Sequence, residues 1–300
     1  MALQAKHIKQ KISAVGNIKK ITKTMEMVAA SKMRRAVEAS LASRAYAVSA
    51  LEILVHLAEE ARAENIFTQE RTTPGAHLMV IVASNKGLAG GYNINVSKKV
   101  TEYCKDNRDV DIHAVCIGKQ AEKIARRNNL TVVASFTEFK DFGHLEDAQA
   151  IMGLVMDLYE RDETYQKIHI AYTQFIKALT YAPKVKPLIP VQAESLYMMI
   201  TDEASPDTLH AAESRALYLF EPSEEEVLAT IVPQLLRAVM YQVLLDAYAA
   251  EHSSRMLAMQ NATENAGELQ KELTISYNKA RQAAITQEIA EISAGANALM

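Results

Sequence analysis

Proline is absent from both ends of this 300-residue chain, and that distribution limits how the chain can fold. All seven prolines lie from Pro74 to Pro233, and glycine is almost absent from the same two flanks. Proline and glycine are the residues that most often end or break helices. The sequence therefore predicts two long terminal helices around an inserted domain, with segments at 1–65, 75–220 and 222–300.

Apolar residues recur at helical spacings of three and four along both flanks. In the first flank the pattern persists for about sixty residues, or roughly 90 Å of helix. In the last flank Ile285, Ile289 and Ile292 follow the spacing of a coiled coil. Helices of this length cannot be buried inside a 300-residue globule. We therefore expect them to pair with each other in an antiparallel coiled coil.

The last helix has a recognisable start and an unusual end. Ser223 is placed to cap it, and Glu226 completes a capping box. Pro233 is expected to bend or interrupt this helix. No charged side chain occurs from residue 292 onward. This end is interpreted either as a tip that inserts into an apolar sleeve of another protein or as a disordered tail.

The middle of the chain alternates between strand-like and helix-like stretches. Strands are expected at 77–84, 111–118, 131–136 and 167–175, with an edge strand at 215–222. The intervening stretches are expected to be helical. This alternation predicts a mostly parallel, Rossmann-like sheet. The predicted fold class is α/β, with a long antiparallel coiled coil of N- and C-terminal helices and an inserted α/β domain.

Signals for bond chemistry are weak. The loop 84–93 (SNKGLAGGYN) has glycines that match neither a dinucleotide fingerprint nor a Walker A loop, so a tight turn is favoured over a phosphate site. The eight histidines do not pair at ligand spacing. Cys104 and Cys116 are interpreted as small buried apolar residues in a reducing compartment. We expect no catalytic residue, cofactor or metal, and hence no enzyme activity in this chain itself.

Charge is distributed unevenly along the chain. The formal net charge is −3, yet residues 1–35 contain nine Lys or Arg and only one acid, Glu26. Such asymmetry indicates an anionic partner or a docking surface. Nucleic acid is disfavoured because the basic region lacks interleaved aromatics and a reader motif. No membrane span and no signal peptide are expected, so the chain is predicted to be cytoplasmic or membrane-bound only through partners.

The segment 22–36 (TKTMEMVAASKMRRA) carries two apolar stripes on one helix. The stripe assigned to the seam with the last helix contains Met25, Val28, Ala29 and Met33. The stripe expected to face outward, toward partners, contains Lys23, Met27, Ala30 and Arg34.

Three regions of the sequence resemble the γ subunit of F-type ATP synthases of bacterial type. They are 21–36, the loop 84–93, and the C-terminal region in which Glu251, Ser254 and Arg255 precede the run 277–299. The resemblance extends over nearly the whole chain. It implies a central-stalk rotor that couples proton or sodium flow through a membrane to ATP synthesis or hydrolysis without performing bond chemistry itself.

The resemblance also implies partners, a location and contact residues. The partners are three α and three β subunits around the terminal helices, with the ε subunit and the c-subunit ring at the inserted domain. The implied location is peripheral, on the cytoplasmic face of the bacterial inner membrane. The implied coupling contacts to α and β are Lys23, Met25, Met27, Arg34, Arg255, Arg281, Gln282 and Thr286. The implied contacts on the c-ring and ε side are Tyr218, Phe220 and Glu221.

Two other classes of protein are compatible with parts of the sequence. One is a homodimeric coiled-coil scaffold with a nucleotide-responsive α/β domain, and the missing phosphate motifs weigh against it. The other is a nucleic-acid protein with a basic arm, which the net charge disfavours.

Overall fold

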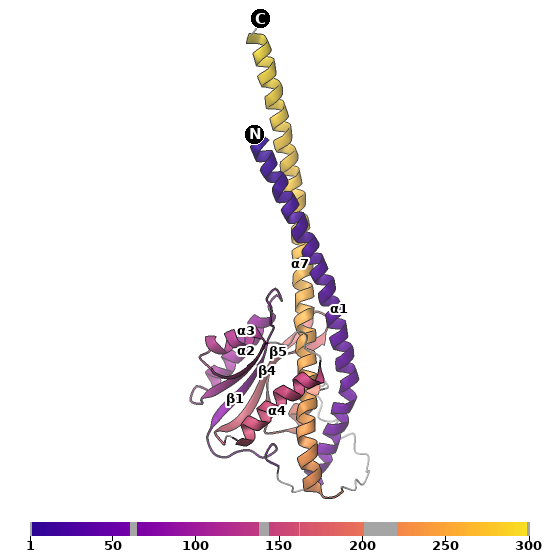
Figure 1. Cartoon of the computed structure of the whole chain (residues 1–300), viewed down its shortest axis with the longest axis vertical. Coiled ribbons are helices and arrows are strands. Elements are labelled where there is room, and N and C mark those ends of the chain that lie inside the picture. Colours follow the sequence, from indigo (N-terminus) through magenta and orange to yellow (C-terminus); the bar gives the residue numbers. More distant parts are fainter. Residues whose placement is uncertain (1, 61–64, 138–143, 162, 201–220, 299–300) are drawn as a thin grey trace. The chain divides into compact units, whose positions relative to one another are not determined.

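A computed structural model of the chain describes residues 2–60, 65–137, 144–161, 163–200 and 221–298 (Figure 1). The chain forms two compact units. The first unit comprises residues 1–29 and 255–300, and the second comprises residues 30–254. The helices α1 (Ala2–Glu60) and α7 (Glu224–Ala298) contribute to both units, so this division differs from the three predicted segments.

The second unit is built on a five-stranded sheet with the order β3-β2-β1-β4-β5 (Figure 1). The strands are β1 (Ala76–Val82), β2 (Ile112–Ile117), β3 (Thr131–Phe136), β4 (Tyr165–Lys177) and β5 (Thr180–Ile189). Every neighbouring pair is parallel except β4 and β5, which are antiparallel. The prediction of a mostly parallel sheet is confirmed.

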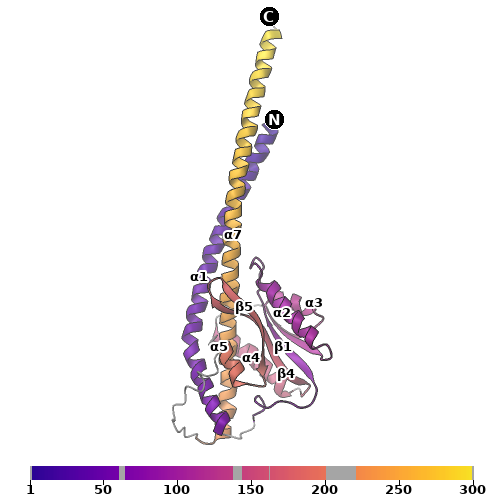
Figure 2. The ribbon, with the colours of Figure 1, turned by 180° about the vertical axis from the view of Figure 1, so that it is seen from behind.

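Helices cover both faces of this sheet, as the views from front and back show (Figures 1 and 2). The helices α2 (Tyr92–Asp106) and α3 (Lys119–Arg127) pack on one face, where Met79 and Ile81 of β1 point. The other face packs against α4 (Leu145–Arg161) and the second unit's part of α7, with Leu78 and Val80 of β1 between them. Because successive side chains of a strand point to opposite faces of the sheet, β1 contributes side chains to two separate cores.

Strand β5 and helix α5 (Ala193–Ile200) were not expected from the sequence. β5 contains Pro183 and Pro187, which cannot donate to a sheet hydrogen bond and argue against a strand. β5 lies at the edge of the sheet, where the outward-facing positions need no donor. Of the edge strand expected at 215–222, residues 215–220 lie outside the described residues.

Helix α7 begins where the sequence predicts, but it continues through Pro233 without an interruption. The backbone N–H of Glu226 donates to Oγ of Ser223 at 3.2 Å, which confirms Ser223 as the cap. The helix then continues through Pro233 to its end at Ala298. Val232 and Leu235 beside the proline are fully buried, and such burial offsets the cost of about 3 kcal/mol for an interior proline. Of the two outcomes expected at Pro233, a bend or an interruption, the interruption does not occur.

One window of α7 is long and apolar enough to cross a membrane, with a mean hydropathy of 1.5, although no span was expected. Half of that window is buried inside the protein. Leu235, Val239 and Val243 of this helix lie in the core of the second unit. Burial of this kind is typical of the core helix of a globular unit.

Candidate functional site

The first unit is an antiparallel pair of helical segments from α1 and α7. Oγ1 of Thr263 donates to Oγ1 of Thr22 at 2.8 Å. Farther along, Gly267 lies against Lys19 and Gly16 lies against Gln270. Residue numbers therefore fall along α7 as they rise along α1, as the predicted antiparallel coiled coil requires.

The two stripes of segment 22–36 are only partly as predicted. Thr22, Ala29 and Ala36 are buried, seven residues apart, which is the repeat of a coiled-coil seam. Val28 is 51% exposed, so its assignment to the seam is wrong. The seam repeats at intervals of seven from Thr22, and Val28 lies one position away from it. Met27 is 56% exposed, as its outward assignment requires.

The implied coupling residues of the first unit are spread along the helix pair. Lys23 at one level of α1 forms an ion pair with Glu26 at 2.8 Å. Arg281 of α7 lies at another level, where it lines a cavity of about 340 Å³ with Lys6 and Lys9. Lys6 and Lys23 are separated by seventeen residues of α1, or about 25 Å. Any partner that meets all of these residues must extend along the pair.

Three of the implied coupling residues, Met25, Thr286 and Arg255, have partly buried or hydrogen-bonded side chains. Met25 is half-buried, and Oγ1 of Thr286 donates to the backbone oxygen of Gln282 at 3.0 Å. Arg255 is only 8% exposed, unlike the exposed Gln282. Burial leaves Arg255 much less available to a partner than the sequence suggests.

The remaining implied contacts belong to the second unit. Arg34 is exposed on α1, and Glu221 is exposed immediately before α7. Tyr218 and Phe220 lie outside the described residues. For the c-ring and ε side, only Glu221 therefore has a described position.

Large apolar side chains are exposed along the first unit. Nine of them are 46% to 73% exposed: Ile18, Ile21, Met27, Val28, Leu269, Ile275, Ile285, Ile289 and Ile292. Single exposed apolar residues are common, but a series of them along one helix pair is typical of a surface that another protein covers.

Two adjacent serines of α7 hold two loops of the second unit, and we call these contacts the serine clamp. Oγ of Ser254 donates to the backbone oxygen of Ala89 at 2.7 Å and accepts from the hydroxyl of Tyr181 at 3.0 Å. Oγ of Ser253 accepts from the backbone N–H of Leu179 at 3.1 Å. Ser253 is fully buried and Ser254 is 2% exposed. The clamp joins α7 to the glycine loop and to the β4–β5 turn.

The glycine loop 84–93 is a tight turn shaped to reach this clamp. Leu88 and Gly90 both adopt positive φ, at 62° and 54°. The side chain of Asn93 closes the turn, since its Oδ1 accepts from the backbone N–H of Ser84 at 3.1 Å. Ala89 is buried at the tip with Tyr92 and Ala250. The geometry matches the favoured interpretation of this loop as a strand-to-helix turn.

A second buried polar cluster lies where α1 and α7 pair within the second unit. Oγ of Ser43 donates to Oε1 of Gln242 at 2.8 Å, and Oγ of Ser40 donates to Oδ1 of Asp246 at 3.2 Å. A polar layer in an apolar seam favours one register over its alternatives because a shift leaves these groups unpaired.

The face of the sheet beneath α2 carries a cluster of two histidines and a tyrosine. The hydroxyl of Tyr103 lies 2.7 Å from Nδ1 of His77 and 3.0 Å from Nδ1 of His169. A hydroxyl donates one hydrogen bond, so one imidazole accepts from Tyr103 and the other donates to it. Burial, with the positive charge of nearby Lys167, lowers the pKa of His77. Burial and neighbouring His77 lower the pKa of His169 from 6.5 to about 4.

We expect this cluster to make folding stability fall as the pH drops. In the unfolded chain His169 takes a proton below pH 6.5, whereas in the folded chain it stays neutral until about pH 4. Stability therefore rises with pH across this window, and His169 contributes a loss of about 2 kcal/mol from pH 7 to pH 5. Urea unfolding at both pH values should show a smaller loss for His169→Gln than for the natural chain. An equal pH dependence in both would contradict the assignment.

No group of three or more His, Cys, Asp or Glu among the described residues is placed to hold a metal ion. Both cysteines are free, and Cys116 is fully buried among apolar neighbours. Burial raises the pKa of its thiol to about 12. A thiol with so high a pKa is a poor nucleophile at neutral pH.

Comparison with known proteins relates this arrangement to the ATP synthases. A family model described as ATP synthase matches residues 4–299. The ATP synthase gamma chain of Roseiflexus castenholzii is 35% identical over 299 residues, which cover 98% of each chain. That of Ruthia magnifica is 37% identical over 300 residues, covering 98% of this chain and 99% of the relative.

Solved structures of the same kind share the fold. The rotor of the Euglena gracilis mitochondrial ATP synthase matches with a TM-score of 0.62 at 17% identity, over 95% of this chain and 100% of that one. A chain of its OSCP/F1/c-ring assembly matches with a TM-score of 0.65 at 16% identity, over 100% and 95%. Since the matches to the family model and to these relatives both extend over almost the whole chain, this chain belongs to the gamma chains of the ATP synthase family.

Proposed function

We propose that this chain is the central rotor shaft of a bacterial ATP synthase, as its sequence predicts. The helix pair of the first unit lies inside a ring of three α and three β subunits. The α/β domain meets the ε subunit and the c-subunit ring, and rotation couples proton or sodium flow to ATP chemistry at the β subunits. The chain is peripheral, on the cytoplasmic face of the inner membrane, and performs no bond chemistry.

The observation that supports this proposal most strongly is the apolar surface of the first unit. Nine large apolar residues are exposed among the described residues of this helix pair, which favours a surface that a partner covers. The cations Lys6, Lys9 and Arg281 on the same pair favour acidic groups on that partner.

Reconstitution tests the proposal directly. Purified chain is mixed with bacterial α and β subunits, ATP and Mg²⁺, and the complex is analysed by mass and by ATP hydrolysis. We expect one copy of this chain for every three αβ pairs and a strong rise in ATPase. A stable homodimer that leaves the α and β subunits unaffected would instead favour the scaffold interpretation.

Arg281 and Gln282 offer a residue-level test in the same complex. Both side chains are exposed on α7, and we expect Arg281→Ala with Gln282→Ala to lower ATPase by about tenfold through loss of charge-assisted contacts to β. Ser276→Ala, at an exposed position on the side of the same helix away from both residues, serves as the control and should change ATPase less than twofold. Equal rates for both variants would show that the coupling contacts lie elsewhere.

A further inference from the structure

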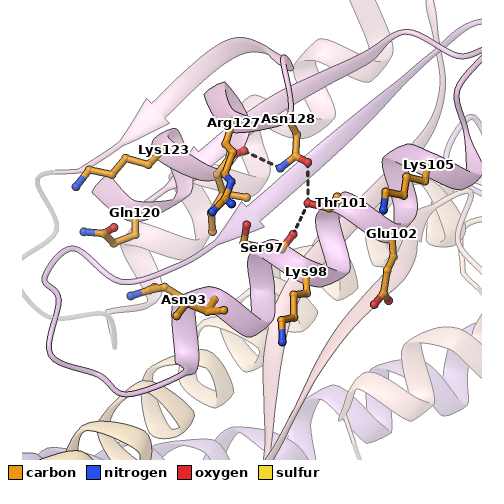
Figure 3. A pocket seen from close by; sticks show the side chains of 12 residues that line it. Asn93, Ser97, Lys98, Thr101, Glu102, Lys105, Gln120, Lys123, Arg127 and Asn128 are labelled. Atoms are coloured by element: carbon orange, nitrogen blue, oxygen red, sulfur yellow. Dashed lines mark hydrogen bonds between the residues drawn. The ribbon is translucent and has the colours of Figure 1, made fainter.

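A groove with cationic walls runs between α2 and α3 of the second unit (Figure 3). Its volume is about 650 Å³. Lys98 and Lys105 come from α2, while Lys123 and Arg127 come from α3. All four side chains are exposed, and the described residues provide none of them with an ion-pair partner. We call this feature the basic groove.

The single acid of the basic groove is already neutralised. Glu102 lines the groove, and its carboxylate accepts from Nζ of Lys99 at 2.6 Å. The groove is therefore locally positive in a chain whose net charge is −3. A concentration of like charge in an otherwise acidic protein favours an anionic ligand.

The floor of the basic groove is rigid and partly apolar. Oγ1 of Thr101 donates to Oδ1 of Asn128 at 2.7 Å, and Nδ2 of Asn128 donates to the backbone oxygen of Ile124 at 2.9 Å (Figure 3). These bonds join α2 to the C-terminal end of α3. Ile124 is 6% exposed on the floor, whereas Ile94 at one end is 60% exposed. Part of the ligand surface must therefore be apolar.

The spacing of the cations indicates an elongated ligand. Lys98 and Lys105 are two helical turns apart, or about 10 Å along α2. Cations spaced in this way suit a ligand that carries several anionic groups along its length. The lining of α2 extends from Asn93 to Lys105, or about 18 Å, which matches about three turns of a helix laid along the groove.

We propose that the basic groove is a docking site for an acidic amphipathic helix of a partner protein. Carboxylates spaced along one side of that helix face the two cationic walls, and an apolar residue covers Ile94. Nucleic acid is a weaker candidate because the groove has no aromatic side chain on which a base could stack. The proposal does not depend on the rotor function, since every residue of the groove lies within the second unit.

The test uses the full-length chain and a labelled synthetic helix. The probe is a fluorescein-labelled peptide of about three turns, with glutamates along one side and leucines along the adjoining side. Fluorescence anisotropy should report saturable binding that weakens as salt is added. Lys98→Glu with Lys123→Glu should weaken binding by about tenfold or more, and Ile94→Gln by about threefold.

Matched controls separate docking from general attraction. Lys86→Glu with Lys119→Glu makes the same change in charge at exposed positions outside the groove, and should leave binding within about twofold. A peptide of the same composition, scrambled so that its leucines no longer share a side, should bind at least about fivefold more weakly. Far-UV circular dichroism confirms that each variant folds.

Three results would overturn the proposal. The scrambled peptide could bind as tightly as the amphipathic one, which would indicate charge attraction alone. The groove variant and its control could lose binding equally. Inorganic tripolyphosphate or single-stranded DNA could displace the peptide at lower concentrations than unlabelled peptide does, which would assign the groove to a phosphate-bearing ligand.

Discussion

Gly118→Ala is expected to destabilise the second unit by at least about 3 kcal/mol. Gly118 joins β2 to α3 with a φ of 92°, a conformation that side chains with a Cβ rarely adopt. A Cβ at this position would lie 2.1 Å from the backbone oxygen of Ala83. That oxygen belongs to the backbone at the end of β1, so it cannot move aside as a flexible side chain could.

Hydrogen bonds around Gly118 hold the ends of β1, β2 and β3 together, so these strands cannot move apart to make room for a Cβ. The backbone N–H of Gly118 donates to the oxygen of Phe136 in β3 at 2.9 Å, and Ala83 donates to the oxygen of Ile117 at 2.9 Å. Three strand ends therefore meet at one residue. Separating them to admit a methyl group costs sheet hydrogen bonds as well as backbone strain.

Gly153→Ala is the matched control for this measurement. Gly153 lies inside α4, and a Cβ there meets no atom within 4 Å. The same chemical change should stabilise the unit by about 0.5–1 kcal/mol because alanine is the better helix former. Urea unfolding is followed by near-UV circular dichroism of tyrosine, since Tyr277 is the only tyrosine of the first unit. A loss below about 1 kcal/mol for Gly118→Ala would show that the turn adopts another conformation.

The sequence predicts the parallel strands well because burial on both faces leaves a continuous apolar run. β1, β2 and β4 lie close to their expected positions for this reason. β3 is mostly exposed at the other edge of the sheet, and its β-branched residues made it predictable instead. β5 was missed because its two prolines resemble a break in structure, and only its position at the sheet edge makes them acceptable. Val28 was misplaced because the usual apolar stripe, about 100° wide, includes the residue beside Ala29, whereas the coiled-coil seam is narrower.

The contacts of the site were harder to predict than the fold. Ser253 and Ser254 follow the same helical spacing whether they face solvent or a loop, so periodicity cannot distinguish the two cases. The partner of Ser254 is the backbone of Ala89, 165 residues earlier in the chain. The cationic walls of the basic groove likewise come from two helices whose charges look like ordinary solvated faces in the sequence.

Ser253→Ala with Ser254→Ala is expected to weaken the coupling of rotation to ion transport more than it weakens ATP hydrolysis. Both hydroxyls are buried, and their removal leaves the N–H of Leu179, the hydroxyl of Tyr181 and the oxygen of Ala89 without these partners. Each unpaired buried group costs about 1–3 kcal/mol. The clamp lies at the C-terminal end of the second unit's part of α7, since the first unit resumes at Arg255.

The reason for a selective effect follows from the proposed rotor function. Hydrolysis depends on how the first unit meets the β subunits, whereas ion transport also requires torque to reach the α/β domain. A loosened clamp lets the glycine loop and the β4–β5 turn separate from α7 under load. In proteoliposomes that contain the assembled enzyme, ATPase should stay within about twofold while the number of ions pumped per ATP falls by about half or more.

A milder variant and a control variant test whether the loss of pumping comes from the clamp. Tyr181→Phe removes only the hydroxyl that donates to Ser254 and should give a smaller loss of pumping in the same direction. Ser49→Ala, at an exposed position of α1, should change neither rate. If pumping and hydrolysis fell in equal proportion in the double variant, the clamp would contribute to folding or assembly and not to torque transmission. If pumping per ATP were unchanged in a folded, assembled enzyme, torque would have to pass through the apolar packing of α7 against the sheet, centred on Leu235, Val239 and Val243.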